Sequence, residues 1–234
     1  MNKINDETST GNACFLCSNL MYCLSNDITK YPCGRERVKV ETTYEKPDDK
    51  RKRLKSKVVI IINGKGGVGK DTMCDFAKEW YHTRVISSIT PIKEIANMIL
   101  KDYGYTEEKG DKERRLLSDL KDAFTRYNNL PLKYLVGELY TFYRSDDDLI
   151  FVHIREPEEI DTLKKYVENE YKIPCITLLI ERDKVEKVYG NHADDDVSNY
   201  DYDEVFYNND TLSRSKDCFY MTLFKLFRER GILN

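Results

Sequence analysis

The chain has 234 residues, enough for one ordinary domain and roughly fifty residues besides. It carries 41 acidic and 38 basic side chains and a formal net charge of -3. Proteins that coat nucleic acid show a clear basic excess, so this balance argues against a nucleic-acid partner.

The hydrophobic pattern also excludes a membrane-spanning protein. No apolar run approaches the roughly eighteen residues that a span needs. Residues 15–24 are the best candidate, but they are too short and lack the charged start and cleavage site of a signal peptide. We therefore expect a cytoplasmic protein, in which the seven cysteines are reduced thiols or metal ligands.

Residues 1–56 differ in composition from the rest and form a predicted cysteine-rich tail and charged linker, followed by a folded domain over 57–234. The tail holds four of the cysteines: Cys14, Cys17, Cys23 and Cys33. Four thiolates suffice for tetrahedral zinc or an iron–sulfur cluster, but only the first pair has the Cys-x-x-Cys spacing. Zinc, a cluster and free thiols therefore all stay open.

The folded domain alternates between strand-like and helix-like segments. A continuous β-branched run at 58–62 is typical of a strand buried on both faces. Further strands are expected at 84–89, 149–154, 175–180 and 204–207, and helices at 73–81, from Pro91, around 116–124, and at 131–143, 158–170 and 211–230. This alternation predicts an α/β fold of three layers, a parallel sheet with helices on both faces.

A glycine-rich segment joins the first strand to the first helix: Gly64, Lys65, Gly66, Gly67, Val68, Gly69, Lys70, Asp71 and Thr72. It fits G-x-x-x-x-G-K-[ST], except that Asp71 replaces the hydroxyl residue. Such a loop turns its backbone N–H groups toward phosphates, and Lys70 would reach the β- and γ-phosphates. The segment predicts ATP binding, with Asp71 and Thr72 as oxygen ligands of Mg2+.

Residues 65–70 resemble the loop of the partition and division-site ATPases. In that family the extra lysine, at the position of Lys65, contacts nucleotide across a dimer, so the resemblance implies a homodimer. The family also carries one Asp after its second strand and another at the end of a later strand. Neither appears in the corresponding residues, 86–93 and 151–157.

A wider resemblance, over about residues 58–230, is to phage-type deoxynucleoside monophosphate kinases and phosphomevalonate kinases, whose loops end in Gly-Lys-Asp as residues 69–71 do. Residues 90–96 resemble the family's proline-lysine helix start, and 154–159 its Asp-x-Arg-x-Pro-x-Glu segment. Residues 208–212 resemble its Asn-Asp-Gly-Thr-Leu turn near the adenine site, without the glycine. His153 stands in place of the family's strand-end Asp.

The resemblance implies an ATP-dependent phosphotransferase that acts on a small phosphorylated acceptor, preferably a nucleoside or deoxynucleoside monophosphate, with phosphomevalonate as an alternative. Lys70 would hold the donor, Arg155 would clamp the acceptor phosphate, and Asn209 would lie near the adenine. Arg114 and Arg115, on the insertion between the second and third strands, would supply a second acceptor contact.

Other readings stay open for the same residues. Arg155 fits a surface ion pair with Glu158 or Glu159, and Arg114 and Arg115 fit an exposed helix face. Lys65 and the cysteine tail suit a non-kinase ATPase that drives assembly or regulation, and His153 suits a module that senses nucleotide without chemistry.

Overall fold

The computed structural model describes residues 50–106, 110–183 and 196–233. The chain divides between residues 49 and 50, and all the described residues lie in the part from 50 onward. The four tail cysteines lie outside the described residues, so the zinc site and the boundary at residue 56 stay predictions. In the part described, no helix is both long and apolar enough to cross a membrane.

The sheet has five strands, all parallel, in the order β2-β3-β1-β4-β5. They are β1 (Val58–Asn63), β2 (Thr83–Ser87), β3 (Leu149–His153), β4 (Cys175–Glu181) and β5 (Glu204–Tyr207). The second strand covers 83–87 where 84–89 was expected, because the chain turns at residues 88 and 89 before the helix that begins at Thr90.

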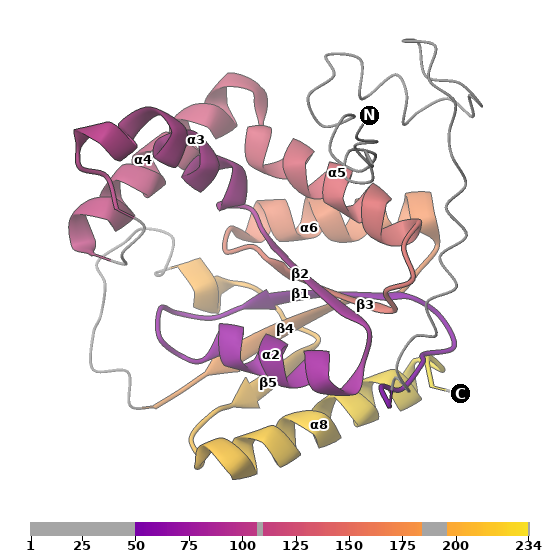
Figure 1. Cartoon of the computed structure of the whole chain (residues 1–234). Coiled ribbons are helices and arrows are strands. Elements are labelled where there is room, and N and C mark those ends of the chain that lie inside the picture. The colour runs from indigo at the N-terminus through magenta and orange to yellow at the C-terminus, as the bar shows by residue number, and fades with distance from the viewer. Residues whose placement is uncertain (1–49, 107–109, 184–195, 234) are drawn as a thin grey trace, which may run out of the picture. The chain divides into compact units, whose positions relative to one another are not determined.

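The longer helices are α2 (Lys70–Trp80), α3 (Thr90–Leu100), α4 (Asp111–Asn128), α5 (Leu130–Tyr143), α6 (Pro157–Tyr166) and α8 (Leu212–Glu229). The short ones are η1 (Lys101–Tyr103), η2 (Val167–Tyr171) and η3 (Asp196–Asn199). Helices α2 and α8 cover one face of the sheet, and α5 and α6 cover the other (Figure 1). The predicted three-layer fold is thereby confirmed.

Strand β1 lies at the centre of the sheet, between β3 and β4, and every one of its residues is buried. Ile60 and Ile62 pack in the core beneath α2 and α8, whereas Val59 and Ile61 pack in the core beneath α5 and α6. Successive side chains of a strand point to opposite faces, so a strand covered on both faces must be apolar throughout.

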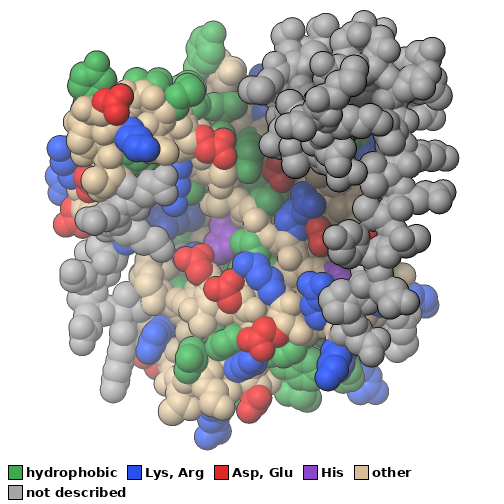
Figure 2. All heavy atoms as spheres, viewed as in Figure 1, with side chains coloured by type: hydrophobic (Ala, Val, Ile, Leu, Met, Phe, Trp, Pro, Cys, Tyr) green, Lys and Arg blue, Asp and Glu red, His purple; other side chains and the backbone are tan. Residues whose placement is uncertain are grey.

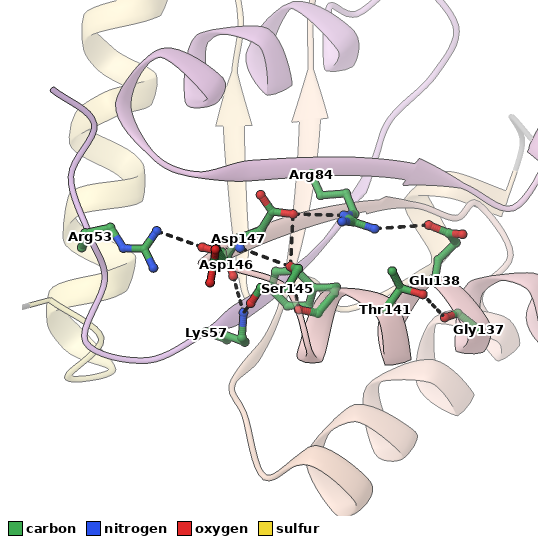
Figure 3. Close-up of polar contacts among 10 residues, drawn as sticks. Arg53, Lys57, Arg84, Gly137, Glu138, Thr141, Ser145, Asp146 and Asp147 are labelled. Atoms are coloured by element: carbon green, nitrogen blue, oxygen red, sulfur yellow. Dashed lines mark hydrogen bonds and ion pairs between the residues drawn. The ribbon is translucent and has the colours of Figure 1, made fainter. Parts of the chain in front are cut away.

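A network of charged groups closes the edge of the sheet where the strands begin (Figure 3). Arg84 of β2 pairs through Nε with Asp147 (3.1 Å) and through Nη1 with Glu138 of α5 (3.7 Å). Lys57, just before β1, donates to the carbonyl of Ser145 (2.7 Å). These contacts place the acidic run 146–148 at the opposite end of β3 from His153.

Segment 52–56 is fastened to the same edge. The side chain of Leu54 is buried, and its N–H donates to Asp148 Oδ2 (3.3 Å). The same oxygen accepts from Arg53 Nε (3.2 Å), and Asp148 itself is 6% exposed. One buried carboxylate thus satisfies both a buried amide and a guanidinium.

We predict that Asp148→Ala lowers the free energy of unfolding by about 1–3 kcal/mol, because the buried N–H of Leu54 loses its acceptor. Asp146→Ala is the matched control, since that side chain is exposed and surface changes stay within about 0.5 kcal/mol. Urea unfolding of both variants measures the difference, and equal losses would contradict the assignment.

Candidate active site

The candidate site lies where the strands of the sheet end. The loop after β1, the segment after β3 and the turn after β5 meet at this edge because parallel strands all point the same way. Figure 2 shows the atoms as spheres in the view of Figure 1, so this edge is seen from the side, with acidic and basic side chains interspersed over the described surface.

The glycine-rich loop is shaped by close backbone contacts. Gly64, Gly67 and Gly69 have φ angles of 144°, 84° and 99°, in the region that favours glycine. A Cβ at Gly64 would lie 2.5 Å from the carbonyl oxygen of Ile180, and one at Gly69 would lie 2.5 Å from Asn208 Nδ2. No other residue fits at either position without movement, so the glycines are required by the packing of the loop.

Lys70 is the first residue of α2, and its side chain folds over the loop. Its Nζ donates to the carbonyl oxygen of Lys65 (2.9 Å) and to that of Gly64. The ammonium therefore lies at the loop whose amides precede the positive end of α2. Backbone, lysine and helix start together suit a bound phosphate chain.

Asn63, the last residue of β1, connects the loop to the segment after β3. Its side chain is fully buried. Its Oδ1 accepts from the N–H of Gly64 (2.8 Å), while its Nδ2 donates to the carbonyl of Arg155 (3.1 Å) and to the hydroxyl of Tyr202 (2.7 Å). A buried amide with all these partners fixes the loop relative to the backbone of Arg155.

His153 ends β3 close to the loop, with its Nε2 3.6 Å from Cys74 Sγ. The pKa of His153 is lowered to about 4, first by burial and then by the positive charges of Lys70 and Arg155, against the opposing effect of Asp71. The imidazole is therefore neutral near pH 7. It supplies no negative charge in place of the strand-end Asp of the kinases that the sequence resembles, whereas the carboxylate of Asp71 lies close enough to act on its pKa.

The other predicted residues occupy different parts of this edge. Arg155 follows β3 and is half-buried. Arg114 is half-buried on α4, whereas Arg115 is exposed beside it, so the two do not share one environment. Asn209 is also exposed and pairs with Asp183 through that residue's N–H (2.9 Å) and Oδ2 (2.8 Å).

Its neighbour Asn208 has the closer contact with the loop. Asn208 is 7% exposed, and its Nδ2 donates to the carbonyl of Val68 (2.8 Å). Its N–H donates to the carbonyl of Glu181 (2.7 Å), which holds the turn after β5 against β4. Sequence reasoning found this turn but selected Asn209, because nothing in the sequence tells which of two adjacent asparagines faces inward.

Lys121 of α4 is a further residue that sequence reasoning missed. It is 8% exposed, and its Nζ lies 2.5 Å from Glu156 Oε1 and 3.4 Å from Glu159 Oε2. A signal existed in the sequence: Lys121 follows Leu117 by one helical turn, and a lysine in an apolar stripe must find partners.

The carboxyl groups of this cluster titrate differently. Burial raises the pKa of Glu159 to about 7, and the adjacent Glu156 adds to the rise while Lys121 opposes it. Burial also opposes ionisation of Glu156, but Lys121 holds the pKa of Glu156 below its ordinary value. Near neutral pH one carboxylate balances the lysine, and the second is partly protonated.

The described residues include no group of three or more His, Cys, Asp or Glu side chains arranged to hold a metal ion. Asp71 and Thr72 remain the predicted Mg2+ ligands, and their place in the first turn of α2, after Lys70, fits an ion shared with bound phosphates.

No family model matches the chain, and no curated protein matches it either. Solved structures do. An APS kinase of Mycobacterium tuberculosis, in complex with AMPPNP and APS, is 10% identical, with 72% of this chain and 98% of that one covered and a TM-score of 0.38. A sugar kinase of a Janibacter species is 12% identical (72% and 94%, TM-score 0.37), and a plasmid partition protein of Borrelia burgdorferi is 14% identical (74% and 100%, TM-score 0.30). At TM-scores below 0.5 these likenesses carry no argument about function.

We predict that Asn208→Ala lowers the free energy of unfolding by about 1–3 kcal/mol and weakens ATP binding, because the Val68 carbonyl loses its buried donor. Asn209→Ala is the matched control one residue away, with a stability change within about 0.5 kcal/mol. For each variant, calorimetric unfolding measures the stability and ATP titration measures the affinity for ATP. Weaker ATP binding for Asn209→Ala alone would instead support the contact predicted from the sequence.

We predict that Glu159 makes stability fall with rising pH. Its folded-state pKa of about 7 exceeds the ordinary 4.5, so its contribution is fully present below about 4.5 and is lost as pH rises through about 7. The difference in unfolding free energy between the native protein and Glu159→Gln should decline across that window. A difference that stays constant with pH would contradict the assignment.

Proposed function

We propose that the protein is an ATP-dependent phosphotransferase that moves the γ-phosphoryl group of ATP onto the phosphate of a nucleoside or deoxynucleoside monophosphate. One observation carries the proposal: the buried side chain of Asn63 joins the glycine-rich loop that Lys70 contacts to the backbone carbonyl of Arg155. A donor-phosphate cradle and a cation for an acceptor phosphate thus occupy one edge of the sheet.

The donor side uses the loop and the start of α2. The backbone amides and Lys70 would hold the β- and γ-phosphates, with Lys70 exchanging its contacts to the carbonyls of Gly64 and Lys65 for phosphate oxygens. Asp71 and Thr72 would hold Mg2+, which neutralises charge that develops on the phosphates.

The acceptor side depends on Arg155. Its guanidinium suits two parallel hydrogen bonds to a phosphate, and Asn63 fixes its backbone carbonyl. Arg114, half-buried on α4, would supply the second contact. An acceptor phosphate is already ionised at neutral pH, so the reaction needs no strong general base, and neutral His153 is compatible with it.

A second candidate is a non-kinase ATPase that works as a homodimer. The observation that favours it is the exposed side chain of Lys65, which leaves the ammonium open to a nucleotide bound by a second copy. The kinase proposal makes Lys65 dispensable, and the dimer proposal makes it essential.

The test measures ADP formation from ATP and Mg2+ with a panel of nucleoside monophosphates and phosphomevalonate. We expect turnover that requires an acceptor and a nucleoside diphosphate product. Arg155→Ala should raise the acceptor KM about ten- to a hundredfold, since a hydrogen bond to a charged group contributes about 1.5–3 kcal/mol. Arg155→Lys keeps the positive charge but cannot make two parallel hydrogen bonds, so its acceptor KM should lie between those of the native protein and Arg155→Ala.

Other outcomes point elsewhere. Turnover without acceptor that rises with protein concentration and disappears in Lys65→Ala would favour the dimeric ATPase. Phosphomevalonate as the preferred acceptor would keep the reaction and replace the substrate. Absence of turnover, with ATP binding that survives Lys70→Ala, would contradict both proposals.

A further inference from the structure

Lys121 is a buried cation outside the phosphate loop. Its ammonium lies within ion-pair distance of both Glu156 and Glu159. With two carboxylates as partners it has no charge to offer an acceptor phosphate, so it is not a substitute for Arg155. A role other than binding phosphate must therefore explain why Lys121 is buried between two carboxylates.

The two carboxylates belong to the segment that carries Arg155. Glu156 precedes α6, and Glu159 lies in its first turn. The Oε2 atom of Glu156 also accepts from the N–H of Arg155 (3.3 Å). The ammonium of Lys121 is therefore separated from the backbone of Arg155 by a single side chain.

Lys121 also continues one face of the insertion helix. Arg114, Ser118 and Lys121 are spaced by four and three residues and lie on one face of α4, and the first two are half-buried. The lysine thus joins the helix that carries Arg114 to the segment that carries Arg155. One ion-pair cluster thus links the two elements that carry the arginines proposed for the acceptor.

Stability does not account for such a cluster. Removing two charges from water costs free energy that their attraction rarely exceeds, and well-packed apolar residues in place of a buried ion pair are often neutral or stabilising. What an ion pair provides, and an apolar contact does not, is a fixed direction between the groups that it joins.

We propose that Lys121, Glu156 and Glu159 form a positioning cluster that fixes α4 relative to Arg155 and so sets the affinity for the acceptor without touching the reacting atoms. The role in acceptor binding rests on the proposed function. The mechanical part, that Lys121 holds α4 against residues 155–160, does not.

The experiment compares Lys121→Met with Lys112→Met, which removes the same charge from an exposed position of the same helix, and with Lys121→Arg, which keeps the charge. We expect Lys121→Met to raise the acceptor KM about tenfold, equal to about 1.4 kcal/mol, with the ATP KM and kcat at saturating acceptor within about twofold. Lys112→Met should match the native protein, and Lys121→Arg should restore most of the affinity.

Amide hydrogen exchange without substrates supplies the second readout. We expect faster exchange in α4 and residues 155–160 of Lys121→Met and unchanged exchange in β1. Unchanged amide exchange in α4 and residues 155–160 would overturn the proposal, whatever acceptor KM is measured. Faster exchange with an unchanged acceptor KM would overturn the link to binding, and faster exchange with no acceptor found would uphold the cluster while the proposed function fails.

A triple variant keeps the test valid if Lys121→Met does not fold. Lys121→Met with Glu156→Gln and Glu159→Gln removes every charge of the cluster and leaves no carboxylate unpaired. We expect it to fold with an unfolding free energy close to native and the same rise in acceptor KM. A triple variant that folds with native acceptor KM would overturn the proposal.

Discussion

The pairing of β1 between β3 and β4 is the constraint on which the site depends. Because both neighbours run parallel to β1, the chain leaves all three strands at one edge. The loop after β1 consequently begins between the exits of β3 and β4. On one side, the carbonyl of Ile180 leaves no room for a Cβ at Gly64. On the other, the side chain of Asn63 donates a hydrogen bond to the carbonyl of Arg155. The parallel pairing of the strands and the side chain of Asn63 together determine where the loop lies.

Because the chain as a whole is nearly neutral, any positive charge for binding phosphate must come from individual side chains at the edge where the strands end. Lys70 and Arg155 supply the cations, while Lys121 is neutralised by Glu156 and Glu159. Burial keeps His153 neutral despite the carboxylate of Asp71. In the proposed function the cations that would face phosphates are therefore Lys70 and Arg155, whereas Lys121 already has two carboxylate partners.

The sequence predicted the fold well because its patterns are local. Each of these patterns can be recognised within a few residues. They are the β-branched run at 58–62, prolines 91 and 131 in the first turns of α3 and α5, and the glycines of the loop. The candidate site was predicted only where a motif carries it, as at Lys70. Asn63, Asn208 and Lys121 were missed because their roles arise from contacts between residues that are distant in the chain.

Ion pairs lie at both edges of the sheet, where the strands begin and where they end, but we assign them different roles. At the beginning of the strands, Arg84 pairs with Asp147, and Asp148 accepts a hydrogen bond from the N–H of Leu54. At the carboxyl end, the pair between Lys121 and Glu156 reaches a residue proposed to bind substrate. Loss of an ion pair at the first edge should appear in stability, because only packing depends on it. At the second edge, under the role proposed for the Lys121 cluster, it should appear in acceptor affinity. Under the proposed function, the location of an ion pair relative to the strand ends, more than its length, would separate charges that only stabilise the fold from charges that position a substrate-binding residue.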